Sequence, residues 1–110
     1  MKYRLIVQDE AVDAIDRIAN YVVDRFGLPL AALRKVELIW RKIDLLAENP
    51  YIGYRLLDDP WYQLDFRVLS CDNYRIVYVP NKEKRTVNII TVLHTLQDLQ
   101  LQLSRLRNDN

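Results

Sequence analysis

Residues 74–79 read Tyr-Arg-Ile-Val-Tyr-Val, and residues 87–93 read Val-Asn-Ile-Ile-Thr-Val-Leu. Both runs are rich in the β-branched and aromatic residues that are enriched in strands. Pro80 and the polar stretch 81–84 between them predict a short turn, so the two strands are expected to be antiparallel neighbours. Residues 62–68 alternate apolar and polar side chains, which predicts a third strand of the same sheet.

Two amphipathic helices are predicted ahead of these strands. Apolar residues recur at helical spacing in residues 12–26 and again in residues 33–47. Asp9 is expected to be the N-cap of the first helix and Gly27 to end it, while Pro29 suits an early position of the second. Because the linker between them is so short, the helices should form an antiparallel hairpin.

The remaining segments complete a single domain. Residues 3–8 predict a first strand, residues 50–60 an irregular loop, and leucines 96, 99, 103 and 106 an amphipathic last helix. The expected fold is α+β, with element order β-α-α-β-β-β-α in one domain spanning 1–110. An antiparallel sheet is covered on one face by the helical hairpin, and function is expected on the opposite, partly open face.

Composition excludes several classes of function. The 110 residues carry a formal charge of +1, which argues against large-scale binding of nucleic acid. One histidine and one cysteine leave no zinc site and no disulfide, and no cofactor or small-molecule substrate is expected. The sequence has no signal peptide and no membrane span, so we expect a cytoplasmic protein.

The predicted sheet offers one candidate catalytic group. A register that placed Arg67, Arg75 and His94 together would form a small cationic cleft, in which arginines hold a phosphate and histidine moves a proton. Such a group could cut RNA. The alternative is that each arginine pairs with a carboxylate such as Asp65 and that His94 is structural.

Several short motifs resemble the RelE/ParE superfamily of toxins from type II toxin–antitoxin pairs. Residues 49–53, Asn-Pro-Tyr-Ile-Gly, are similar to the family's Asn-Pro-x-x-Gly turn, and Phe66-Arg67 follows. Residues 73–78, Asn-Tyr-Arg-Ile-Val-Tyr, resemble its Tyr-Arg-Ile-x-Tyr strand, and Val-Leu-His at 92–94 is followed by Asp98. Together these motifs span nearly the whole chain.

The resemblance implies two possible activities. RelE-like members are ribosome-dependent mRNA endonucleases, and Arg75 matches an arginine that they use. ParE-like members poison DNA gyrase and lack that catalytic set. Thr95 stands where the nucleases have an arginine, and the ending resembles ParE, so we favour a gyrase poison without catalysis of its own. A ribosome-dependent nuclease is the alternative, and an inactive relative that only binds its antitoxin and represses the operon is the third.

The resemblance also implies a cognate antitoxin as partner, with gyrase or the ribosome as target. Apolar residues of the helical hairpin are expected to form the antitoxin groove, for instance Val23, Leu30 and Trp40. Aromatic residues around the irregular loop are candidate anchors for the target, because such side chains often carry much of the binding energy. These residues are Tyr54, Trp61 and Tyr62. For both sets the alternative is ordinary packing in the core.

Overall fold

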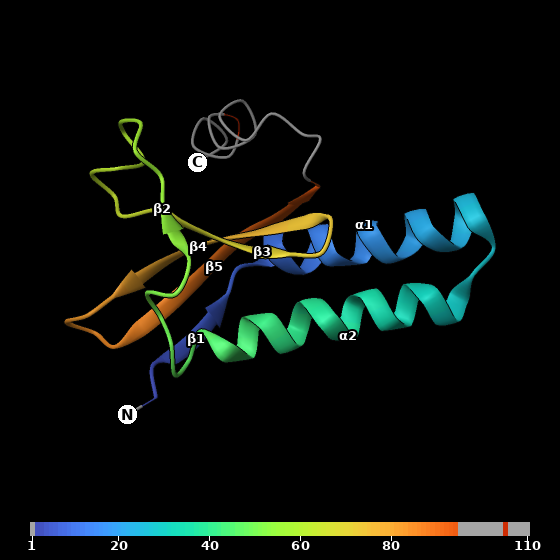
Figure 1. Ribbon diagram of the computed structural model, residues 1–110, viewed down its shortest axis with the longest axis horizontal. Helices are drawn as coiled ribbons and strands as arrows, with labels where there is room; N and C mark the ends of the chain where they lie inside the picture. Colours follow the sequence, from blue (N-terminus) through green and yellow to red (C-terminus); the bar gives the residue numbers. More distant parts are fainter. Residues whose placement is uncertain (1, 95–104, 106–110) are drawn as a thin grey trace.

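The computed structural model describes residues 2–94 and 105 and has the predicted α+β architecture. Helices α1 (Asp9–Phe26) and α2 (Pro29–Leu45) form an antiparallel hairpin. The hairpin packs on one face of a sheet, and its tip extends past the strands (Figure 1). The predicted last helix lies outside the described residues.

The sheet has five strands in the order β1-β5-β4-β3-β2. They are β1 (Arg4–Val7), β2 (Tyr54–Arg55), β3 (Arg67–Cys71), β4 (Tyr74–Asn81) and β5 (Thr86–His94). Strands β2 to β5 are antiparallel, which confirms the predicted pairing of β4 with β5. Strand β1 runs parallel to β5, so the sheet is mixed rather than wholly antiparallel. The connection between β1 and β5 is long, as a parallel pair requires, and contains the hairpin and strands β2 to β4.

Short-range signals explain the helix boundaries. Gly27 adopts the left-handed conformation (φ 62°), and its N–H donates to the carbonyl of Val23 at 2.8 Å, which ends α1 as predicted. Pro29 is the first residue of α2, also as predicted. Asp9 was expected to be the N-cap of α1, but Gln8 is, and Asp9 is the first helical residue. There its carboxylate still lies near the positive end of the helix dipole.

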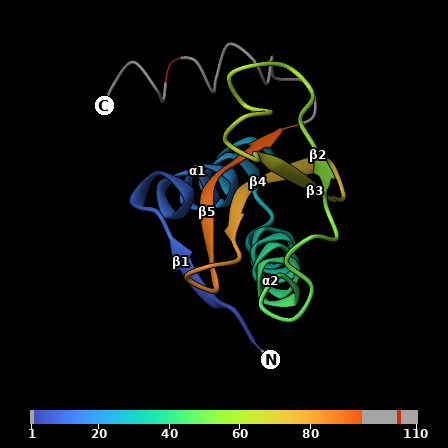
Figure 2. The same ribbon diagram turned by 90° about the vertical axis from the view of Figure 1, so that its left-hand side faces the viewer.

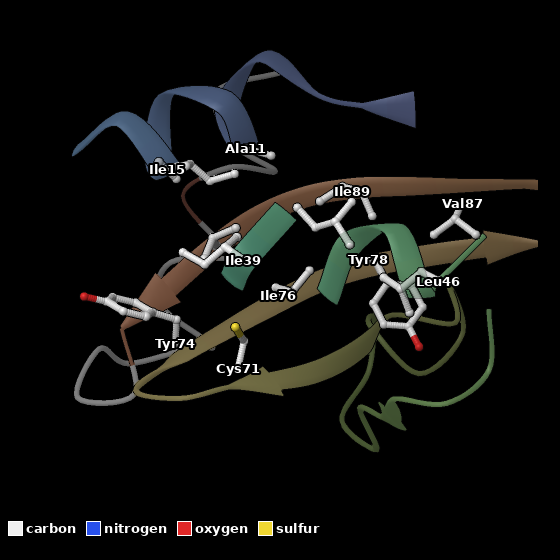
Figure 3. Close-up of a cluster of buried hydrophobic side chains, with 13 residues drawn as sticks. Ala11, Ile15, Ile39, Leu46, Cys71, Tyr74, Ile76, Tyr78, Val87 and Ile89 are labelled. Carbon is white, nitrogen blue, oxygen red and sulfur yellow. The ribbon is translucent and has the colours of Figure 1, made fainter. Parts of the chain in front are cut away.

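Most of the core lies between the hairpin and the sheet. Ala11 and Ile15 of α1 and Ile39 of α2 point toward Ile76 and Ile89 of the two central strands (Figure 3). Of the apolar series predicted for α1, Ile15 and Val22 are buried, whereas Val12 and Phe26 are exposed. The buried face is therefore turned slightly from the predicted one and includes Ala11.

A second, smaller cluster fills the opposite face of the sheet. Trp61 and Phe66 from the β2–β3 connection pack with Val68, Val77 and Leu93. Figure 2 shows this connection on the side of the strands away from α2. Part of the face that was expected to be open is therefore covered by the chain itself.

The predicted strand over residues 62–68 is wrong. Residues 61–65 form turns, and β3 begins only at Arg67. Asp65 has a left-handed backbone (φ 57°), which breaks any extended run at this point. Burial of Trp61 and Phe66 in the second cluster outweighs the local alternation, because packing rather than intrinsic preference decides such segments. The two-residue strand β2 lies in the segment predicted as loop.

Candidate functional site

The turn that enters β2 is fastened to the sheet through a buried hydrogen bond. The N–H of Gly53 donates to the hydroxyl oxygen of Tyr78 at 2.8 Å, and Tyr78 is fully buried. A Cβ on Gly53 would lie 2.6 Å from that oxygen and 2.6 Å from the carbonyl oxygen of Val68. Only glycine fits here, so the loop approaches β3 and β4 in one fixed position.

A carboxylate between two guanidinium groups holds the β2–β3 connection (residues 56–66) just before β3 begins. The Asp65 Oδ1 atom lies 3.1 Å from Arg55 Nε and 3.2 Å from Arg67 Nε. All three atoms are buried and none has a hydrogen-bond partner among the described residues, so the contact is an ion pair without aligned hydrogen bonds. The ion pair balances two neighbouring positive charges that would otherwise repel each other.

The two arginines also bind the loop backbone and aromatic rings. Arg55 Nη2 donates to the Tyr62 carbonyl at 2.8 Å, and the Arg55 guanidinium lies 4.1 Å from the Tyr62 ring centre. Arg67 Nη1 contacts the Gly53 carbonyl at 3.4 Å, and its guanidinium lies 4.9 Å from the Tyr51 ring centre. The two arginines therefore hold the backbone and the aromatic rings on both sides of β2 at several points.

The candidate catalytic residues Arg67, Arg75 and His94 are not brought together. His94 pairs with Tyr74 in the β4–β5 register, whereas Arg75 pairs with Leu93. Since neighbouring residues of a strand point to opposite faces, Arg75 and His94 lie on opposite faces. Arg67 pairs with Tyr78, four residues along β4 from Tyr74, or roughly 13 Å at strand spacing.

Each member of the trio has its own surroundings. Arg67 is engaged by Asp65, as the alternative interpretation of the sequence expected. The His94 ring packs edge-on against the Tyr74 ring, with ring centres 5.5 Å apart. Lys35 Nζ lies 5.6 Å from the centre of the Tyr74 ring. Arg75 is half-buried beside the β3 residue Ser70. A phosphate held by one of these groups would not reach the other two.

The predicted partner-binding residues differ in accessibility. Tyr54 and Tyr62 are exposed, with 50% and 38% of their surface accessible, whereas Trp61 is 3% exposed and belongs to the second core cluster. The expectation of an exposed Trp61 is wrong, because the indole is used to close the far face of the sheet. On the hairpin, Val23 and Leu30 are exposed, and Trp40 is half-buried against the main core.

Sequence reasoning missed Tyr78 and Arg55 as residues that fix this loop. It named Asp65 only as a possible partner of an arginine, and Gly53 only as part of a turn motif. The Asn-Pro-x-x-Gly turn drew attention to Gly53, but nothing local shows that a tyrosine 25 residues later would fill the space above it. The positive φ of Asp65 has no sequence signal either, since aspartate adopts that conformation only where its contacts require it.

Burial raises the pKa of Tyr78 above its ordinary value of 10.0, and the hydrogen bond from Gly53 opposes this shift. A group whose pKa is raised in the folded state stabilises the fold below the unfolded pKa and loses that contribution as the pH rises through the folded one. We therefore expect the free energy of unfolding to fall above about pH 10. Urea titrations from pH 8 to 11 should show a smaller fall for Tyr78→Phe than for the wild type.

Other chemistry has little support in the described part of the chain. Burial raises the pKa of the Cys71 thiol, which keeps it protonated and a poor nucleophile. Among residues 2–94, no three histidine, cysteine or acidic side chains lie close enough together to hold a metal ion. None of the described helices has the length and apolarity needed to span a bilayer.

Comparison with known proteins assigns the fold. The chromosomal ParDE system of P. aeruginosa contains a chain of similar structure, with a TM-score of 0.68 and 18% identity over 84% of this chain and 96% of that one. A mutant of the E. coli toxin RelE in its free state has a TM-score of 0.61 and 21% identity, covering 98% of this chain and 93% of that one. The RelBE2 complex of Mycobacterium tuberculosis has a TM-score of 0.60 and 19% identity, covering 86% of this chain and 99% of that one. No curated protein sequence matches significantly.

A family model provides the closer assignment. Residues 5–99 match the model of the ParE toxin of the type II toxin–antitoxin system parDE. The match begins in β1, continues through the hairpin and the Gly53 turn, and passes β5. It therefore covers all the residues that hold the segments around β2, which are Gly53, Arg55, Asp65, Arg67 and Tyr78. This chain belongs to the ParE toxin family, within the RelE/ParE superfamily of toxins of type II toxin–antitoxin systems.

Proposed function

We propose that this toxin acts by poisoning DNA gyrase in the cytoplasm and that it has no catalytic activity of its own. The separation of Arg67, Arg75 and His94 carries the proposal, because a nuclease has to place its phosphate-binding and proton-transfer groups around one phosphodiester. The match to the ParE model and the near-neutral charge of the chain support the same choice.

Two exposed tyrosines, Tyr54 of β2 and Tyr62 of the β2–β3 connection, are the proposed contacts with gyrase. The hydrogen bond of Gly53 holds the chain just before Tyr54, and Arg55 donates to the carbonyl of Tyr62. Rigid tyrosines lose little conformational entropy when they bind, which is why they are frequent at interfaces. Trp61 supports this surface indirectly, because its buried indole packs the connection onto the sheet.

A cognate antitoxin is the second proposed partner. The P. aeruginosa and M. tuberculosis structures are toxin–antitoxin systems, and this chain has an exposed apolar surface on its hairpin. Val23 and Leu30 are accessible there, and Trp40 contributes the edge of its half-buried ring. An amphipathic antitoxin helix would bind this surface through apolar side chains spaced three and four residues apart.

The target is tested with purified components. The toxin is made by cell-free synthesis and added to gyrase with supercoiled plasmid and, separately, to a translation reaction. We expect gyrase-linked DNA cleavage to accumulate while translation continues, and we expect Tyr54→Ala with Tyr62→Ala to weaken the effect about tenfold or more.

The opposite outcome distinguishes the alternatives. Arrest of translation with cut mRNA, abolished by Arg75→Ala, would replace the gyrase proposal with a ribosome-dependent nuclease. No effect in either reaction, together with antitoxin binding, would indicate an inactive relative that acts only in repression.

A further inference from the structure

The outward face of α2 carries a row of leucines and arginines that nothing in the described chain covers. Leu30, Arg34, Leu38, Arg41 and Leu45 follow one another at spacings of four, four, three and four residues. That spacing places them on one side of a helix. All five are exposed, and the accessible fraction of the three leucines ranges from 38% to 69%. Exposed apolar side chains gathered on one side of a helix are typical of an interaction site.

The outward face of α1 carries the opposite charge. Asp9, Asp13, Asp16 and Asp24 are exposed, and Val12 and Val23 lie beside them. Helix α1 has five acidic and two basic residues, a net charge of −3, whereas α2 has two acidic and four basic residues, a net charge of +2. One hairpin therefore presents an acidic and a basic surface side by side.

Most charged side chains on these two outward faces have no ion-pair partner within the described chain. The ion pair within the hairpin joins Arg17 to Glu10 on the same helix, and Lys35 of α2 pairs with Asp72 of the β3–β4 turn. Over residues 2–94, Arg34 and Arg41 form no ion pair, and neither do Asp13, Asp16 and Asp24. The arginines are thus available to bind a partner that brings carboxylates.

We propose that two copies of this chain associate through their hairpins, with α1 of each copy lying on α2 of the other. A two-fold axis parallel to the hairpin places the two tips together and makes the facing helices antiparallel. Counted from the linker, Arg41 is level with Ala14, so it lies between Asp13 and Asp16 of the other copy. Arg34 is level with Tyr21 and within a helical turn of Asp24.

The same arrangement buries several of the exposed apolar residues. Phe26, Leu28 and Leu30 of both copies meet at the tips. Leu45 is level with Glu10 of the other copy and within a helical turn of Val12. The helices are 18 and 17 residues long, so they can pair over nearly their whole length. A two-fold axis across the hairpin would instead place α1 on α1 and bring the aspartates of both copies together, which is unfavourable.

A second copy fits this surface better than other occupants do. Nucleic acid would be repelled by the aspartates of α1, and a single acidic helix would pair with α2 alone. A second hairpin supplies both complements at once. Since Val23 and Leu30 are also the proposed antitoxin contacts, the antitoxin and the second copy would exclude each other. The dimer does not depend on which target the toxin has.

Charge reversal with cross-complementation tests the dimer. One variant carries Arg34→Glu and Arg41→Glu, and the other carries Asp13→Lys, Asp16→Lys and Asp24→Lys. We expect the wild type to dimerise in sedimentation equilibrium at micromolar concentration, and each variant alone to raise the dissociation constant about 100-fold or more. An equimolar mixture should regain the dimer, because each acidic helix then faces a basic one.

A matched control separates this pairing from general attraction between oppositely charged proteins. Lys82→Glu with Lys84→Glu makes the same change of net charge in the β4–β5 turn, away from the hairpin. It should dimerise with itself as the wild type does. Combined with the lysine variant, it should form mixed dimers no more tightly than the wild type forms with that variant. Circular dichroism checks that all variants are folded. A monomeric wild type, or a mixture of the two hairpin variants that stays monomeric, would overturn the proposal.

Discussion

Replacing Gly53 with alanine is expected to lower the free energy of unfolding by about 3 kcal/mol, near the upper end for overpacking of a core site. The added Cβ would meet the Tyr78 hydroxyl at 2.6 Å and the Val68 carbonyl at 2.6 Å. Both atoms belong to central strands and cannot move without disturbing the sheet. Urea unfolding followed by circular dichroism measures the change.

Gly27→Ala is the matched control for this prediction. Gly27 has open space around its Cα but a φ of 62°, so alanine there is strained only through its backbone. That strain costs roughly 1–2 kcal/mol. If the two substitutions cost the same, or if Gly53→Ala is the milder one, the close approach of the loop to Tyr78 is not what fixes it.

Trp61→Ala is expected to destabilise the protein by about 4 kcal/mol, as for other large aromatic residues removed from a core. The indole is 3% exposed and its ring centre lies 5.1 Å from that of Phe66. Its loss would leave a cavity over Val68, Val77 and Leu93. The midpoint of urea unfolding and the tryptophan fluorescence of the folded state should both change.

Tyr62→Ala separates the core role of Trp61 from the surface role of its neighbour. Tyr62 is exposed, and its ring contacts the Arg55 guanidinium, which is worth roughly 0.5–1 kcal/mol at such a site. A small loss of stability for Tyr62→Ala beside a large one for Trp61→Ala is the expected pattern. Comparable effects would contradict the assignment of Trp61 to the core.

The sequence predicted those parts of the fold that depend on local chemistry. Gly27 and Pro29 give the boundaries of the hairpin linker, because left-handed backbone and a missing N–H are properties of single residues. The apolar residues at positions 76, 78 and 89 face the helices because the strand period is two. These features need no knowledge of distant segments.

The candidate site depended on register, which local patterns do not fix. A shift of one residue moves a side chain to the other face of a sheet, and β4–β5 aligns His94 with Tyr74 rather than with Arg75. A bulge on β5 at Ile90 changes the alternation again, so that Ile89 and Val92 both face the main core. Trp61 was placed on the surface for a related reason, since only the folded sheet shows what lies beneath it.

The parallel pairing of β1 with β5 has a consequence for the timing of biosynthesis. Arg4 is paired with Thr86, so the first strand finds its neighbour only after about 80 further residues have left the ribosome. At 5–20 residues per second this takes on the order of 4–16 s, during which the side of α1 that packs on β5 is uncovered. A message cut before the codons for residues 86–94 would yield a fragment with no finished sheet, and such a fragment should be harmless to the cell that makes it.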